Sequence, residues 1–120
     1  MKTITLILLI GISSFQFKSE CADAYSAAEK ARDLAKKSYK SDSWKDSKSL
    51  LKEAMESAND AKSFASDCVC QNANSAANDA YKYAKQGYDT DSMNDTKNFA
   101  KKAMKSADDV MSLIDDCTVR

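Results

Sequence analysis

Apolar residues between positions 21 and 117 recur at steps of three and four, the spacing of amphipathic helices rather than the alternation of strands. Four rows of this kind can be traced, and most of their members are alanine. The rows are Ala24, Ala28, Ala31 and Ala35; Leu51, Ala54, Ala58, Ala61 and Ala65; Ala73, Ala77, Ala80 and Ala84; and Ala100, Ala103, Ala107, Val110 and Ile114. The pattern therefore predicts four helices, each of which buries one narrow face.

Polar segments at 40–46 and 89–95 separate the rows and are rich in Ser, Asp and Thr, whose short side chains cap helix N-termini. Each segment contains a pair that resembles a capping box with Asp in the position of Glu. The pairs are Ser43 with Asp46 and Ser92 with Asp95. These signals predict an antiparallel hairpin around each segment, with the second helix beginning at Trp44.

The chain is also an internal repeat. A shift of 49 positions aligns residues 21–68 with residues 70–117 without a gap, and 22 of the 48 aligned residues are identical. Repeats are sought first because they fix the architecture. The sequence predicts an all-α domain over 21–117, in which two homologous antiparallel helical hairpins form an up-down-up-down four-helix bundle. Two hairpins stacked as a short solenoid are the alternative, although solenoids usually need three repeats.

Four cysteines flank the two repeats, each three positions from the end of a row, so that all four should face the interior. Three pairings are open to them. Pairing Cys21 with Cys68 and Cys70 with Cys117 closes two long loops, each worth about 4 kcal/mol in the chain-entropy model. Pairing Cys68 with Cys70 constrains almost nothing. We therefore expect one disulfide per hairpin, which offsets the small area that an alanine interior buries.

The N-terminus has the form of a secretory signal peptide. Lys2 precedes an apolar run over residues 4–12, which is too short to span a bilayer. We expect a signal peptide over residues 1–19, with cleavage between residues 14 and 20, and an uncleaved anchor as the alternative. No later segment is apolar enough for stable membrane insertion. The mature protein is therefore predicted to be secreted, either extracellular or periplasmic.

Charge and composition exclude several functions. The chain has 18 basic and 18 acidic residues, no histidine, no proline and two glycines. A balanced charge without a basic cluster gives little attraction to nucleic acid or anionic lipid. The commonest general base is absent, as is any glycine-rich phosphate loop, so we predict that the protein is not an enzyme and has no cofactor.

Metal binding has two weak signals. Four cysteines at one end of a bundle could form a tetrahedral thiolate site, but an oxidising compartment and the spacing favour disulfides. The loop with Asp89, Asp91 and Asp95 has carboxylates near the spacing of a calcium loop. It lacks the central glycine and the closing glutamate, so helix capping explains these residues better. We therefore assign no metal site.

The most suggestive surface is at the predicted hairpin tips, where four large side chains could form an exposed binding patch or pack against the neighbouring helix. These residues are Tyr39, Trp44, Tyr88 and Met93. A glycosylation sequon, Asn94-Asp95-Thr96, lies at the same place. The sequence thus favours a module that binds another extracellular or periplasmic protein without catalysis. The alternatives are a carrier of a small ligand or metal ion, held in the interior or at the cysteine end, and a purely structural component.

Overall fold

The computed structural model describes the backbone of residues 2–119 and the side chains of residues 20–117. Within those limits the chain forms four helices and no strand. The helices are α1 (Lys2–Lys40), α2 (Trp44–Asp67), α3 (Gln71–Asp89) and α4 (Met93–Val119). The predicted all-α class is confirmed. The predicted signal peptide lies outside the residues whose side chains are described.

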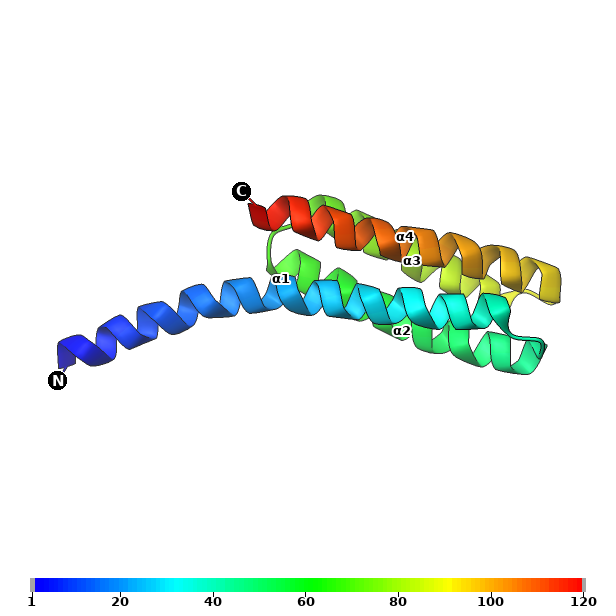
Figure 1. Ribbon diagram of the computed structural model, residues 1–120, viewed down its shortest axis with the longest axis horizontal. Helices are drawn as coiled ribbons and strands as arrows, with labels where there is room; N and C mark the ends of the chain where they lie inside the picture. The colour runs from blue at the N-terminus through cyan, green and yellow to red at the C-terminus, as the bar shows by residue number, and fades with distance from the viewer. Residues whose placement is uncertain (1, 120) are drawn as a thin grey trace.

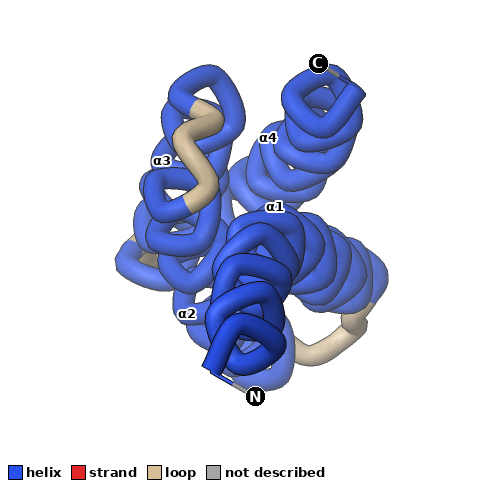
Figure 2. The backbone as a smooth tube through the Cα atoms, turned by 90° about the vertical axis from the view of Figure 1, so that its left-hand side faces the viewer, coloured by secondary structure: helices blue, strands red, loops and turns tan. Residues whose placement is uncertain are grey.

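The helices form a bundle in which consecutive members run in opposite directions (Figure 1). α1 packs against α2 and α4, and α3 packs against the same two helices, whereas the diagonal pairs meet much less. The view along the bundle shows the four helices at the corners of a quadrilateral (Figure 2). The first half of α1 extends beyond the other three helices (Figure 1). Among the described residues, no helix combines the length with the apolar character that crossing a bilayer requires.

The N-terminal caps of α2 and α4 have the form that the sequence predicts. Ser43 precedes α2 in an extended conformation, and its Oγ accepts a hydrogen bond from the Asp46 amide at 3.3 Å. Ser92 does the same for the Asp95 amide at 3.4 Å. An acidic residue in the first turn also complements the helix dipole. Helix α2 therefore begins at Trp44, as the capping signal predicts.

The interior is built from the predicted rows, every member of which is buried. Its middle layer is a ring of four alanines, one from each helix, which lets the helices approach closely. These are Ala31, Ala58, Ala80 and Ala107. Larger side chains fill the layer at the disulfide end, including Val110, Met111 and Ile114. The layer nearest the tips is lined by alanines around a single buried large residue, Leu51.

Both predicted disulfides are confirmed. Cys21 is bonded to Cys68 with a Cα–Cα distance of 5.3 Å, and Cys70 to Cys117 with a distance of 6.0 Å. Each bond joins the start of the first helical arm of a hairpin to the end of the second. The two bonds lie at the same end of the bundle, opposite the tips, because only Val69 separates the hairpins.

The connection between the hairpins is a strained helix C-terminus. The Cys70 amide donates to the Ala65 carbonyl at 2.9 Å and the Val69 amide to the Ser66 carbonyl at 3.1 Å, the pattern of a Schellman motif. This motif requires a left-handed residue, normally glycine, and Val69 holds that position with φ of 59°. A β-branched residue in this conformation is unfavourable by about 1–3 kcal/mol.

Replacing Val69 with glycine should stabilise the protein by about 1 kcal/mol, because glycine adopts positive φ without steric conflict. The exposed valine side chain loses few contacts on removal. Urea denaturation of the oxidised protein would measure the difference. Val69→Ala is the matched control, since it keeps a β-carbon and should gain less. A Val69→Gly variant no more stable than Val69→Ala would contradict the assignment of strain.

Candidate functional site

The tip of the bundle is organised around Trp44, the first residue of α2. Its indole N–H donates a hydrogen bond to Thr96 Oγ1, on the diagonal helix α4, at 3.1 Å. Thr96 is fully buried, and its hydroxyl in turn donates to the carbonyl of Gly87 on α3 at 2.9 Å. Trp44 nevertheless remains 37% exposed. The ring is thus fixed to the second hairpin while part of its surface faces solvent.

A lysine links Trp44 to a second aromatic ring. The Lys48 ammonium lies 5.1 Å from the centroid of the Trp44 ring and 5.5 Å from that of Tyr88. Both distances are within the range of cation–π attraction. The structure therefore brings two of the four predicted tip residues together, and we call Trp44, Lys48 and Tyr88 the tip aromatic cluster.

Tyr39 belongs to a different part of the tip. It is 40% exposed and lines an open hollow of about 510 Å³ between α1 and α4, with Lys40, Asn94, Lys97 and Asn98. The last predicted tip residue, Met93, is half-buried at the start of α4. The predicted patch is therefore divided between the tip aromatic cluster and the hollow beside Tyr39.

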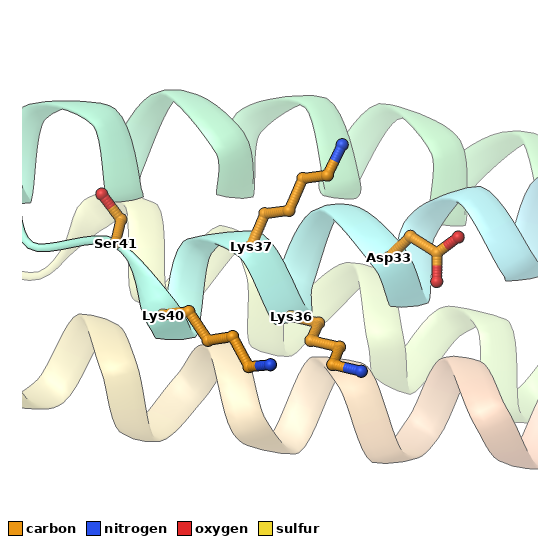
Figure 3. Close-up of a pocket in the computed structure, with 5 residues that line it drawn as sticks. All are labelled: Asp33, Lys36, Lys37, Lys40 and Ser41. Atoms are coloured by element: carbon orange, nitrogen blue, oxygen red, sulfur yellow. The ribbon is translucent and has the colours of Figure 1, made fainter.

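The end of α1 forms the other side of this region. An open hollow of about 440 Å³ is lined by Asp33, Lys36, Lys37, Lys40 and Ser41. Lys36 and Lys40 extend toward α4, whereas Lys37 extends toward α2 (Figure 3). The α4 side of α1 therefore presents lysine ammonium groups next to the hollow that Tyr39 lines.

A second set of tip residues was not identified from the sequence. Ser38 Oγ donates to the Ser47 carbonyl at 2.7 Å, and Ser47 Oγ donates to the Ser38 carbonyl at 2.8 Å. Both serines are fully buried and join α1 to α2 below the tip. Ser38 lies three residues after Ala35, and Ser47 lies four residues before Leu51, so both continue the apolar rows. This spacing alone could have predicted that the two serines are buried, although they are polar.

Arg32 carries the described ion pairs of the bundle surface. Its guanidinium lies 3.2 Å from Asp33 and 3.6 Å from Asp108, which connects α1 to α4. Partial burial lowers the pKa of Arg32, but the hydrogen bonds and charges of these two carboxylates outweigh it and raise the pKa overall. Arg32 is therefore a structural cation rather than a group available to titrate.

The cysteine end offers no thiolates, because all four cysteines are in disulfides. Among the residues with described side chains, no three His, Cys, Asp or Glu are grouped as metal ligands would be. No family model matches the chain, and no curated protein or solved structure matches it either. The geometry of the tip is thus the basis for a functional proposal.

Proposed function

We propose that the protein is an exported, disulfide-stabilised helical module that binds another protein through its hairpin tips. Two intrachain disulfides are typical of an oxidising compartment. The predicted signal peptide is consistent with the same location. The partner would then be an extracellular or periplasmic protein, and no catalytic step is involved.

The observation that carries this proposal is the position of the exposed large apolar residues. Among the described side chains there are three, Tyr39, Trp44 and Val69, and the first two are at the tips. Aromatic residues are the most frequent anchors of protein interfaces. Trp44 is also held by Thr96 and Lys48 before any partner binds, so it would lose little conformational freedom on binding.

Quantitative capture would test the proposal. The oxidised protein is immobilised, exposed to fluid from the compartment into which it is exported, and compared with tip variants at matched loading. Trp44→Ala and Tyr39→Ala should each reduce the retained partner at least tenfold, whereas Val69→Ala, at the opposite end, should retain it fully. Melting temperatures of all variants identify any loss that comes from unfolding. Equal capture by folded tip variants, or loss with Val69→Ala alone, would refute the proposal.

A further inference from the structure

The charges of α4 are separated into two blocks along the helix. From position 97 to 105 every charged residue is a lysine, and from 108 to 116 every charged residue is an aspartate. All eight side chains are exposed or half-buried. The positive block consists of Lys97, Lys101, Lys102 and Lys105, and the negative block of Asp108, Asp109, Asp115 and Asp116. The tip half of α4 is therefore positive and the disulfide half negative.

Helix stability does not explain this order. The helix dipole disfavours acidic residues near the C-terminus of α4, where Asp115 and Asp116 lie, and the i, i+4 spacing of Lys97, Lys101 and Lys105 places like charges next to one another. The repeat does not explain it either, because α2 has acidic and basic residues intermixed. Glu56 aligns with Lys105, and Asn59 aligns with Asp108. The separation is thus specific to α4 and disfavours the isolated helix, which points to an interaction outside it.

Helix α1 extends the positive block across the groove between α1 and α4. Lys36 and Lys40 extend toward α4 (Figure 3), and they line open hollows together with Lys97 and Lys105. Within the part of the chain whose side chains are described, none of these four lysines has an ion-pair partner. The two acids that line these hollows are paired with Arg32. The sequence expectation of a surface without a basic cluster is therefore corrected for this face.

We propose that two copies of the chain pair antiparallel across their α1–α4 faces, with each positive block opposite the negative block of the other copy. A two-fold axis near the middle of α4 would place Lys97 opposite Asp116 and Lys105 opposite Asp109. Each copy then contributes the same surface, which gives a closed dimer rather than a fibre. A parallel pairing would bring like charges together. At 1.5 Å per residue, the paired segment is about 28 Å long.

A second copy fits this face better than an external ion or polymer. The net charge of the chain is zero, and each block has charges on exposed or half-buried side chains, which include Lys97, Lys101 and Lys105 in one block and Asp109 and Asp116 in the other. A polyanion attracted to the lysines would be repelled by the adjacent aspartates. A polycation attracted to the aspartates would be repelled by the adjacent lysines. Only a partner with the same two blocks in antiparallel order is complementary to both, and the chain itself is such a partner.

The dimer should be weak and sensitive to salt, because charged side chains dominate the face. Exposed ion pairs are screened over about 10 Å at 0.1 M salt and about 3 Å at 1 M. Sedimentation velocity of the oxidised protein should show dimers at 20 mM salt and millimolar protein. The dissociation constant should rise at least tenfold at 500 mM salt. A monomer under all these conditions would overturn the proposal.

Charge reversals test the arrangement. Reversing the positive block (Lys97→Glu with Lys105→Glu) or the negative block (Asp109→Lys with Asp116→Lys) should leave only monomer. The variant with all four changes should dimerise again, because positions 97 and 116, and positions 105 and 109, would once more carry opposite charges across the two-fold axis. Asp108 is kept so that its contact with Arg32 remains. Circular dichroism and melting temperature establish that each variant is folded.

The matched control is Lys45→Glu with Lys52→Glu, which makes the same change in net charge at exposed positions of α2. This control should dimerise as the unmodified chain does. A folded four-change variant that stays monomeric, or an equal loss in the α2 control, would overturn the antiparallel pairing. Carbodiimide coupling of mixed ¹⁴N and ¹⁵N protein should join Lys97 of one copy to Asp116 of the other. Links that occur only within single copies would also overturn it.

Discussion

Replacing Leu51 with alanine should lower the free energy of unfolding by about 2–5 kcal/mol, the range for removing a buried leucine and leaving a cavity. Leu51 is fully buried, and the other buried apolar residues of its layer are alanines, which cannot extend to refill the space. The larger residues of this layer, Leu34, Met55, Tyr83 and Met104, are only partly buried. Urea denaturation monitored by far-UV circular dichroism would measure the loss. Leu50→Ala, at the half-buried adjacent position, is the control and should lose less than half as much.

The same layer allows a sharper test, because the Leu51 side chain packs directly against Gly87, where a β-carbon would otherwise be. A Cβ added at Gly87 would lie 2.5 Å from Leu51 Cδ1 and 3.0 Å from Phe99 Cβ, both too close without a shift. In the unmodified chain, Gly87→Ala should therefore destabilise the protein despite the better helix propensity of alanine. In the Leu51→Ala background the conflict with Leu51 Cδ1 is gone while those with Phe99 Cβ and the Thr96 carbonyl oxygen remain, so the same change should cost at least about 1 kcal/mol less.

A smaller cost of Gly87→Ala in the Leu51→Ala background than in the unmodified chain is the outcome that identifies direct packing of Leu51 on Gly87. The coupling between contacting residues should be on the order of 1–3 kcal/mol. Equal effects of Gly87→Ala in both backgrounds would mean that the two residues do not compete for the same space. The tip layer would then not be packed as described.

Removing the second disulfide by changing Cys70 and Cys117 to alanine should destabilise the protein by about 2–5 kcal/mol. The sequence separation of 47 residues makes the closed loop long, so its loss frees a large part of the unfolded chain. Removing the Cys21–Cys68 bond should have an effect of similar size, because its loop has the same length. Thermal and urea unfolding of both variants would measure these losses.

Removal of both disulfides should leave a chain that is largely unfolded at 37 °C, since the middle layer of four alanines buries little area. As the matched control, the unmodified oxidised protein is treated with a thiol-alkylating agent. Its cysteines should not be alkylated, because all four are in disulfides. A double-removal variant with an unchanged melting temperature would show that packing alone stabilises the bundle.

Much of the fold could be predicted because its signals are local. The spacing of apolar residues predicts the four helices, and Ser43 and Ser92 predict where α2 and α4 begin. The disulfide pairing follows from the hairpins, since each brings its own first and last cysteine together. These features depend on periodicity, capping and chain geometry, which a single sequence displays directly.

The organisation of the tip could not be predicted, because it depends on contacts between the two hairpins. The sequence places Trp44 near a tip but does not indicate that its indole donates to Thr96 on the diagonal helix. Polar side chains do not by themselves indicate burial, so residue type does not predict that Ser38 and Ser47 are interior residues whose mutual hydrogen bonds satisfy them there. Each of these contacts joins residues from different helices.

The meaning of the charge blocks of α4 also could not be predicted from the sequence. They are visible in the sequence from Lys97 to Asp116, yet a count over each repeat gives a nearly neutral total and hides them. Their meaning depends on which helix lies beside α4. Only the structure shows that the α1 residues beside the positive block include two more lysines, Lys36 and Lys40, which enlarge it.

The most direct test of the architecture is a disulfide map of the native protein. Trypsin leaves Cys68 and Cys70 in one peptide, residues 63–82, so electron-transfer fragmentation must separate them by cutting the backbone at Val69. The fragment with Cys68 should carry the Cys21 peptide, and the fragment with Cys70 the Cys117 peptide. A bond between Cys68 and Cys70, or between Cys68 and Cys117, would contradict two hairpins that are each closed by their own disulfide.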